Sequence, residues 1–268
     1  MKLEEAKRSG KEFLKKNNID EREARLLLAF VLNISSDELI RTSEITEDKF
    51  EEYQNALNRR VQGTPFSYIT GEKEFMKLKF KVNENVLIPR PETEILVEEA
   101  LKYKPENVLD VCTGSGCIAI SIAYYSEQTN VSALDISKAA LEIANENAKL
   151  NGVDVEFICS DLFENVNRKY DIIVSNPPYI ETSVIDTLEK EVKSEPHIAL
   201  DGGADGLEFY RRIAKEARKY LKENGTLLFE IGYNQGESVS KLLMDNDYNN
   251  VRIIKDLSEN DRVCVGNI

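Results

Sequence analysis

The four residues Asn176-Pro177-Pro178-Tyr179 are the part of this chain whose types and spacing most directly suggest chemistry, and they follow an apolar run at residues 170–174. Each proline fixes its own φ at about −65° and has no N–H, and a residue before proline is kept out of the helical region. The pattern predicts a stiff, extended lip that holds the Asn176 amide in place. The carbonyls of Asn176 and Pro177 have few local partners, so they can accept the two hydrogens of a planar –NH₂ group. Transfer of a group to an amide or exocyclic amine requires such a grip, whereas a single Asn-Pro pair would more simply be a strand exit.

A second candidate site is the stretch at residues 108–119, which is typical of a strand, a glycine turn and the start of a helix. Gly114 and Gly116 allow a tight turn and the close approach of a ligand to the backbone. The Gly-x-Gly-x-x-Ala spacing also fits a dinucleotide fingerprint, but Asp110 at the strand end would help to hold a cationic ligand and would sit poorly beside a pyrophosphate. Together with the lip, this favours S-adenosylmethionine over NAD. The predicted cofactor-binding residues of this stretch are Asp110, Cys112, Thr113, Gly114, Ser115 and Gly116.

Two further predicted strand ends carry aspartates in the order that a nucleoside cofactor needs. Asp135 ends the second strand, and its carboxylate can accept both hydroxyls of a ribose. Asp161 follows the third strand and can accept a hydrogen bond from an adenine amino group, while Leu162 packs on the ring. Asn176 completes the predicted cofactor-binding set. Each aspartate by itself is equally well explained as a turn or a helix cap, and it is the three acidic strand ends together that favour the cofactor.

The composition limits the kinds of partner. The 268 residues carry a net charge of −13 without a long Lys/Arg block, so nucleic acid is disfavoured as the direct substrate and a protein partner fits better. The four cysteines form no Cys-x-x-Cys pair and His197 is the only histidine, so no metal site is expected. The N-terminus lacks the apolar core of a signal peptide, and no apolar run approaches the ~20 residues that span a bilayer. We therefore expect a cytoplasmic monomer without a membrane partner.

The order of predicted elements indicates an α/β fold with a small second domain. Residues 1–67 are predicted to form a helical domain, and the alternation at residues 68–88 predicts a β-hairpin connector. From residue 89 to residue 268 strands alternate with helices, which indicates a doubly wound, mostly parallel, Rossmann-like sheet of seven strands that ends in an antiparallel pair. Ligands of such sheets bind at the carboxyl ends of the strands, where Asn176 stands. The predicted strands are 107–111, 131–135, 155–159, 171–175, 226–231, 251–255 and 262–265.

From residue 88 onward the chain resembles the HemK/PrmC family of glutamine-N5-methyltransferases, which modify peptide chain release factors. The helical N-terminus resembles the smaller domain of that family in size and character, and Cys112 stands where the family commonly has glycine. The resemblance rests on Ile88-Pro89-Arg90-Pro91-Glu92-Thr93-Glu94, Leu109-Asp110-Val111-Cys112-Thr113-Gly114-Ser115-Gly116, Ser160-Asp161-Leu162-Phe163, Asn176-Pro177-Pro178-Tyr179, Glu195-Pro196, Gly202-Gly203, Asp205-Gly206-Leu207 and Glu230-Ile231-Gly232.

This resemblance implies an S-adenosylmethionine-dependent enzyme that methylates the glutamine of a Gly-Gly-Gln motif in release factors. The glutamine –NH₂ would bond to Asn176 and to the Pro177 carbonyl, with Pro178 and Tyr179 alongside, so that Asn176, Pro177 and Tyr179 would act in catalysis. The N-terminal helices would dock the protein substrate. No strong general base is expected, because the nitrogen-bound proton becomes acidic once the methyl group has arrived.

Two alternatives stay open at the level of sequence. An exocyclic-amine methyltransferase acting on DNA or RNA would capture a flipped base in the same lip, although the net charge and the Pro-Arg-Pro-Glu-Thr-Glu segment disfavour it. A cofactor-binding protein without catalysis is disfavoured by the intact lip. For Arg90 and Glu92, capping and domain packing are as good an explanation as function. His197 is expected to be an ordinary loop residue.

Overall fold

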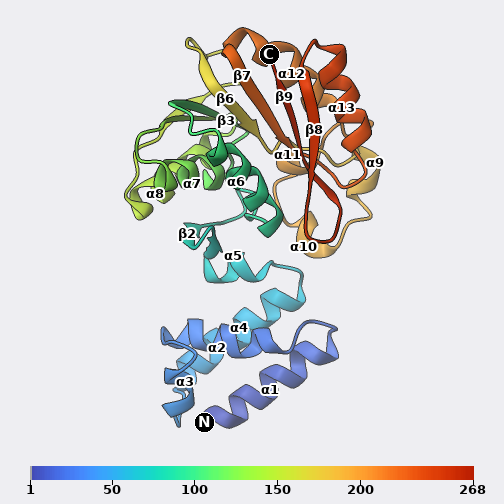
Figure 1. Cartoon of the computed structure of the whole chain (residues 1–268). Coiled ribbons are helices and arrows are strands. Elements are labelled where there is room, and N and C mark those ends of the chain that lie inside the picture. The colour runs from blue at the N-terminus through green and yellow to red at the C-terminus, as the bar shows by residue number, and fades with distance from the viewer. Residues whose placement is uncertain (1) are drawn as a thin grey trace. The chain divides into compact units, whose positions relative to one another are not determined.

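The computed structural model describes residues 2–268, which divide into two compact units (Figure 1). The first unit consists of the chain up to Gly71 together with Glu189–Ser194, and the second consists of Glu72–Leu188 and Glu195–Ile268. The β-hairpin that the sequence predicts is present, and it clusters with the second unit. The domain boundaries expected at residues 67 and 88 stay predictions.

The first unit is helical. Apolar side chains on one face of each longer helix meet in a single core, whose fully buried members include Leu14, Leu27, Leu28 and Tyr53. The Tyr53 hydroxyl donates to the carbonyl of Ala24 at 3.1 Å, which satisfies the one polar atom of this buried ring. The helices of this unit are α1 (Leu3–Lys16), α2 (Arg22–Leu32), α3 (Glu38–Arg41), α4 (Glu47–Val61), α5 (Phe66–Thr70) and α10 (Lys190–Lys193).

A buried arginine connects the Glu189–Ser194 segment to the other helices of this unit. The Arg60 guanidinium is only 5% exposed and lies 2.5 Å from a carboxylate oxygen of Glu23 and 2.8 Å from one of Glu191. The Ser194 hydroxyl donates to the carbonyl of Gly63 at 3.1 Å. A charge so far from water requires partners of opposite sign, so a segment distant in sequence supplies one of the two carboxylates that Arg60 needs.

The second unit is built on a seven-stranded sheet with the order β5-β4-β3-β6-β7-β9-β8. Neighbouring strands pair in parallel from β5 to β7, and β9 pairs antiparallel with both β7 and β8. The doubly wound, mostly parallel sheet predicted from the sequence is therefore confirmed, including its antiparallel end. The strands are β3 (Asn107–Val111), β4 (Asn130–Asp135), β5 (Glu156–Cys159), β6 (Tyr170–Ser175), β7 (Leu221–Glu230), β8 (Asn249–Lys255) and β9 (Asp261–Asn267).

Helices cover both faces of this sheet (Figure 1). One core lies between the sheet and α6, α7, α8 and the hairpin, and a second lies between the opposite face and α12 and α13. Both faces of the parallel strands are thus buried, which is why these strands read as continuous apolar runs. The remaining elements are β1 (Glu72–Phe75), β2 (Leu78–Lys81), the 3-10 turn η1 (Pro91–Thr93), α6 (Glu94–Lys102), α7 (Cys117–Tyr125), α8 (Lys138–Asn151), α9 (Thr182–Ile185), α11 (His197–Leu200), α12 (Glu208–Tyr220) and α13 (Gly236–Asp245).

The pairing of β3 with β6 positions the candidate site. Val111 lies opposite Ser175 in the parallel register, and the Ser175 hydroxyl donates to the Val111 carbonyl at 2.7 Å. From these two central strands the chain continues outward in opposite directions, to β4 on one side and to β7 on the other. The glycine turn after β3 and the lip after β6 therefore open on the same edge, which is the topological switch point where open α/β sheets bind ligands.

The turn after β3 enters α7 at Gly116, where φ is +82° and a side chain has no room. A Cβ there would lie 2.8 Å from Cδ1 of Ile120 and 3.0 Å from Cβ of Ala144 in α8. We expect Gly116→Ala to lower the free energy of unfolding by about 2–4 kcal/mol, because left-handed strain and overpacking add. Gly152→Ala is the matched control, since Gly152 has φ +68° with open space around it, and it should lose only about 1 kcal/mol. Chemical denaturation measures both, and equal losses would contradict the steric role of the α7–α8 contact.

Candidate active site

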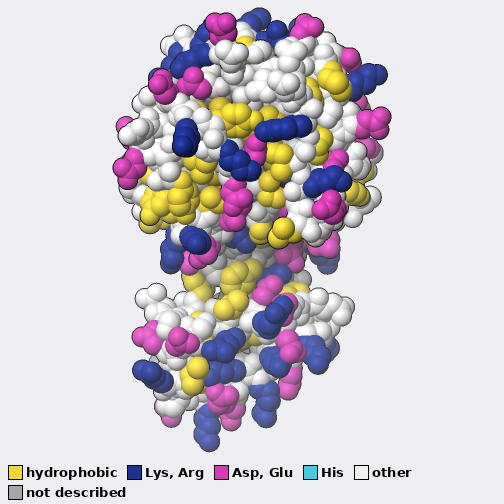
Figure 2. All heavy atoms as spheres, viewed as in Figure 1, with side chains coloured by type: hydrophobic (Ala, Val, Ile, Leu, Met, Phe, Trp, Pro, Cys, Tyr) yellow, Lys and Arg dark blue, Asp and Glu magenta, His cyan; other side chains and the backbone are white. Residues whose placement is uncertain are grey.

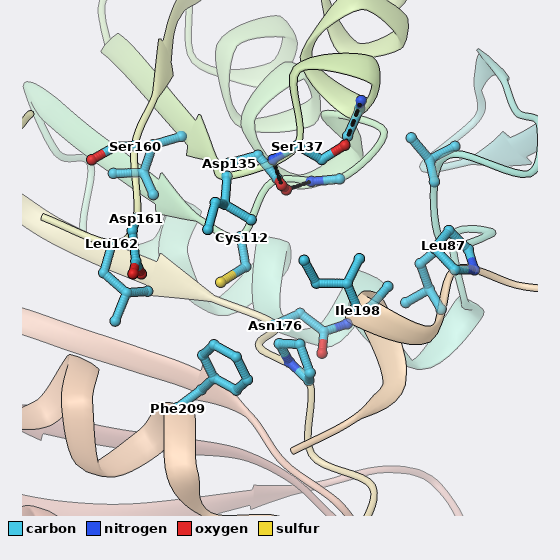
Figure 3. Close-up of a pocket in the computed structure, with 18 of the residues that line it drawn as sticks. Leu87, Cys112, Asp135, Ser137, Ser160, Asp161, Leu162, Asn176, Ile198 and Phe209 are labelled. Atoms are coloured by element: carbon cyan, nitrogen blue, oxygen red, sulfur yellow. Dashed lines mark hydrogen bonds between the residues drawn. The ribbon is translucent and has the colours of Figure 1, made fainter. Parts of the chain in front are cut away.

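A cavity opens at the carboxyl ends of the parallel strands, with an empty volume of about 860 Å³ that includes its mouth. This size falls in the range of ~300–1,000 Å³ that is usual for small-molecule sites. Figure 3 shows side chains from the end of β4 and from the segments that follow β3, β4, β5 and β6 arranged around one space. The structure brings together seven of the predicted site residues on its walls, namely Cys112, Gly114, Asp135, Asp161, Leu162, Asn176 and Pro178.

Other walls come from residues that sequence reasoning did not single out. Leu87 precedes the Ile88-Pro89-Arg90 motif, Ile198 lies in α11, and Phe209 and Arg212 lie in α12 (Figure 3 labels the first three). Arg212 donates to Asp161 at 2.7 Å, so one oxygen of this predicted adenine ligand already has a partner. The sequence did hold a signal, because Phe209 and Arg212 come two and five residues after the Asp205-Gly206-Leu207 motif.

Asp135 at the end of β4 has the geometry expected of a ribose ligand. Its Oδ2 accepts from the N–H of Gly114 at 2.9 Å, and its Oδ1 accepts from the N–H of Ser137 at 2.9 Å. Burial raises the pKa of the Asp135 carboxyl, and these two backbone donors oppose the shift. Each oxygen keeps a lone pair free, so the carboxylate is fixed in orientation and can still accept two hydroxyl groups.

Asp110 in β3 has a different position from the one expected for a ligand contact. Its side chain is fully buried and does not line the cavity; Oδ2 accepts from the Thr113 hydroxyl at 2.6 Å and from the Ala119 N–H at 3.3 Å. Burial raises the pKa of the Asp110 carboxyl to about 7. Asp110 thus ties the glycine turn to the first turn of α7, and its direct contact with a cofactor stays a prediction. Thr113, Ser115 and Gly116 are also buried and do not line the cavity.

Cys112, where the sequence departs from the glycine common in the resembled family, has φ +62°. A left-handed conformation favours glycine, because any other residue pays a strain of about 1–2 kcal/mol there. The thiol faces the cavity (Figure 3), and burial raises its pKa, so it stays a neutral thiol. Cys112 therefore keeps the backbone turn that a glycine would make and adds a small apolar surface to the cavity wall.

The lip carries Asn176 at the rim of the cavity. Its Nδ2 donates to the Thr93 hydroxyl at 3.4 Å, so its Oδ1 is the atom left for a ligand. Pro177 and Pro178 are buried, and only Pro178 of the two lines the cavity. Tyr179 is half-buried outside the cavity wall, and burial raises the pKa of its phenol to about 12. The roles predicted for Pro177 and Tyr179 stay predictions.

Gln235, which sequence reasoning missed, holds the lip from behind. Its Nε2 donates to the Tyr179 carbonyl at 3.1 Å and to the Gly206 carbonyl at 3.2 Å, and its Oε1 accepts from the Gly232 N–H at 3.0 Å. The glycines of the neighbouring loop allow this close packing, because a Cβ on Gly202 would lie 2.7 Å from the Tyr179 Cα. The Gly-Gly-x-Asp-Gly-Leu motif is therefore a backbone contact surface for the lip.

The Ile88-Pro89-Arg90 segment is held by one buried carboxylate. Glu195 Oε2 accepts from the Ile88 N–H at 3.0 Å, and its Oε1 forms an ion pair with Arg90. Arg90 thus fixes the start of the loop that carries Ile198 to the cavity. His197 begins the short helix α11 and does not lie in a loop, so the expected loop position is wrong; it is exposed and does not line the cavity, and its lack of a role stays a prediction.

Two features that residues 2–268 lack bear on other functions. In this described part of the chain no group of three or more His, Cys, Asp or Glu side chains is placed to hold a metal ion. No helix in the same part is long and apolar enough to cross a membrane.

Comparison with known proteins gives matches along nearly the whole chain. The Methyltransferase small domain model matches residues 91–201, and the PrmC N-terminal domain model matches residues 5–71. A release factor glutamine methyltransferase of Clostridium acetobutylicum is 42% identical over 280 residues, which cover 99% of this chain and 98% of that protein. Another, from Thermodesulfovibrio yellowstonii, is 38% identical over 265 residues and 95% of each chain. A solved methyltransferase structure from Pyrococcus furiosus has a TM-score of 0.58 at 17% identity, with 80% of this chain and 98% of that chain covered, and supports the fold.

The sheet order and the cavity at its switch point, with the glycine turn and the lip beside it, define an S-adenosylmethionine-dependent methyltransferase. The chain belongs to the family of release factor glutamine methyltransferases. The family resemblance, the enzyme class and the cofactor predicted from the sequence are thereby confirmed. The residues present fit the cofactor, because the oriented Asp135 carboxylate suits a ribose, and the apolar faces of Leu162 and Phe209 suit a flat ring.

The buried Asp110 gives a prediction for stability against pH. Its carboxyl has a pKa of 3.8 unshifted and about 7 when folded, so between about pH 4 and pH 7 the folded state holds a proton that the unfolded state has lost. The free energy of unfolding should therefore fall as pH rises through this window, on the order of 4 kcal/mol at most from this group. Asp110→Asn cannot ionise but can still accept from Thr113. The free energy of unfolding of Asp110→Asn minus that of wild type should therefore rise from pH 4 to pH 7, because only wild type loses stability over this range. Urea titrations at each pH measure this difference, and a constant value would contradict the raised pKa of Asp110.

Proposed function

We propose that this chain transfers the methyl group of S-adenosylmethionine to the side-chain amide nitrogen of the glutamine in the Gly-Gly-Gln motif of peptide chain release factors. The observation that carries the proposal is the Asn176 amide, whose Nδ2 is engaged by Thr93 and whose Oδ1 is left to accept at the rim of the cofactor cavity. The full-length similarity to release factor glutamine methyltransferases supports the same substrate.

The lip serves the nucleophile. An amide nitrogen reacts poorly because its lone pair is delocalised into the carbonyl. When Asn176 Oδ1 accepts one substrate N–H and the Pro177 carbonyl accepts the other, the nitrogen is held in one orientation at the cavity. The same acceptors stabilise the positive charge that develops on nitrogen during the reaction, and they need no reorganisation because the prolines already fix the backbone.

The residues at the ends of the other strands form the part of the site that would bind the methyl donor. S-adenosylmethionine, when bound, supplies a methyl group on a positively charged sulfur that makes it a good electrophile. Asp135 would hold the ribose hydroxyls, while Leu162 and Phe209 would enclose the adenine. One N–C bond forms, one S–C bond breaks and one nitrogen-bound proton is released. The Tyr179 phenol stays neutral during this step, because burial raises its pKa to about 12.

The charge distribution favours a protein substrate over nucleic acid. The chain carries a net charge of −13, and Figure 2 shows acidic and basic side chains interspersed on the visible face, without a continuous basic field. Binding that depends on phosphate contacts would need such a field. The helical unit, which matches the PrmC N-terminal domain, is our candidate for docking the release factor.

A labelled-methyl assay tests this proposal. Labelled S-adenosylmethionine is offered with a release factor, with the same factor after Gln→Ala in its Gly-Gly-Gln motif, and with total RNA or DNA. Label on the intact factor alone is the expected result. Label on nucleic acid would instead favour the exocyclic-amine alternative, and label on both forms of the factor would reject the proposed acceptor.

Asn176→Ala should remove most turnover while leaving the affinity for S-adenosylmethionine within a few-fold. The loss of an oriented acceptor at a developing charge corresponds to roughly a 100-fold to 1,000-fold drop in kcat. Single-turnover methylation measures the rate, and calorimetry measures the cofactor affinity. Turnover equal to that of wild type would reject the role of Asn176.

Asp135→Ala should act on the cofactor instead. Removal of a carboxylate that accepts two hydroxyl groups is expected to weaken the Kd for S-adenosylmethionine by roughly 10-fold to 100-fold. Calorimetry provides the measurement, and Asp154→Ala, at an exposed aspartate of the same unit, is the control that should change nothing. An unchanged Kd in Asp135→Ala would refute the assignment.

A further inference from the structure

A buried carboxylate that the mechanism has not used lies directly behind the lip. Glu230 ends β7, and the parallel register of β6 with β7, in which Ser175 pairs with Phe229, places it beside Asn176. Only 4% of Glu230 is exposed, and it does not line the cavity. The side chains of Thr93 and Asn176 both make hydrogen bonds to it, and Thr93 is itself 2% exposed. Within residues 2–268, its Oε2 has no hydrogen-bond partner.

The contacts form a short relay with a definite direction. Asn176 Nδ2 donates to the Thr93 hydroxyl oxygen at 3.4 Å, and hydrogen bonding by Thr93 and Asn176 lowers the pKa of the Glu230 carboxyl. An ionised carboxylate can take part in these bonds only as the acceptor. A carboxylate has only acceptors, whereas an amide has acceptors on one side and donors on the other. An ionised Glu230 can therefore face only the –NH₂ side of Asn176, and this leaves Oδ1 for the substrate.

The orientation of this amide decides whether the lip works. If the Asn176 side chain turned over, its –NH₂ would face the –NH₂ of the incoming glutamine, and neither group could accept from the other. The two orientations have nearly the same shape, so packing alone does not select between them. The selection has to come from hydrogen-bonding partners behind the amide.

We propose that Glu230, with Thr93 as its relay, is the positioning residue that keeps the acceptor oxygen of Asn176 directed at the substrate amide. The inference rests on the proposed function, because it assigns a cause to the orientation on which that function depends. It also makes substrate capture sensitive to the protonation of Glu230, since a protonated carboxyl can donate to Oδ1 and stabilise the opposite orientation.

The surroundings of Glu230 set the pH at which its carboxyl gains or loses a proton. Burial raises the pKa of the Glu230 carboxyl to about 7, and hydrogen bonds from Thr93 and Asn176 lower it only in part. The groups that face it are Arg262 from β9, Glu92 from η1, Tyr179 from the lip, Tyr210 from α12 and Cys117 from α7. Arg262 donates to Asp256 at 2.8 Å and acts on Glu230 through its charge alone. Glu230 is thus neutral below about pH 7 and ionised above it.

The test compares wild type with Glu230→Gln at saturating S-adenosylmethionine. The variant keeps the shape, but its amide can turn either its oxygen or its –NH₂ group toward Asn176. It therefore no longer selects one orientation of Asn176, and kcat/KM for the release factor should fall about tenfold to a hundredfold at pH 8. Wild-type kcat/KM should rise with pH through about 7, because this parameter reports groups of the free enzyme. The variant should lack this rise. An unchanged kcat/KM, or a reduced one that keeps the rise, would overturn the proposal.

A second readout does not depend on activity. The side-chain –NH₂ resonances of Asn176 should shift with pH near 7 in wild type and stay constant in Glu230→Gln; constant resonances in wild type would count against the relay. Thr93→Val removes the relay hydroxyl without a change of size and should lower kcat/KM in the same direction. Because both residues act on one amide, the double variant should lose less than the product of the two single losses; a full product would contradict the relay.

Controls separate a positioning effect from damage to the fold. Glu99→Gln changes another buried glutamate of the same unit, which bonds to Arg252 and Lys102 away from the cavity, and it should leave kcat/KM unchanged. In every variant the Kd for S-adenosylmethionine should stay within twofold of wild type. If wild type methylates a different amide or amine, the proposed substrate fails while the same comparison with that acceptor still decides the role of Glu230.

Discussion

The parallel register between β3 and β6 is the constraint on which the candidate site depends. It sets Val111 opposite Ser175, and the Ser175 hydroxyl bonds to the Val111 carbonyl. Each strand therefore ends at the same height, and the glycine turn and the lip share one edge of the sheet. Because parallel strands buried on both faces cannot slip without exposing apolar side chains, the distance between the donor half and the acceptor half is fixed by the core. The sheet therefore sets the alignment of the reacting groups.

The lip itself depends on segments that are remote in sequence. Gln235 bonds to the Tyr179 carbonyl, and the Gly-Gly-x-Asp-Gly-Leu loop packs against the same backbone. Glu195 fixes Ile88 and Arg90, next to the segment that brings Leu87 to the cavity. These contacts give the motifs scattered between residues 88 and 235 a common structural role, which is to support the lip and the cavity. They supply the supporting contacts that hold a reactive constellation in place.

The sequence was sufficient for the sheet, the lip and part of the cavity wall, because buried strands and glycine or proline turns leave local patterns. It was not sufficient for Leu87, Phe209 or Gln235, whose positions are set by how loops close over the sheet. The helices α9, α10 and α11 have four residues each, too few for a helical period to show. Asp110 shows another limit, because the local pattern does not reveal that its side chain lies buried behind the glycine turn.

Asp110 and Glu230 have a common physical feature that connects stability with function. Both are buried carboxyls at the ends of central strands, and burial raises the pKa of each to about 7. A buried ionisable group with an unpartnered oxygen destabilises the fold relative to an apolar residue of the same size. Within the described residues, 2–268, each of these two has one such oxygen. Each also orders a segment that faces the cavity, Asp110 the glycine turn and Glu230 the amide of the lip. Only acceptor groups can hold N–H and O–H donors in one direction, so an apolar residue at either position would stabilise the sheet while leaving the site without a fixed orientation.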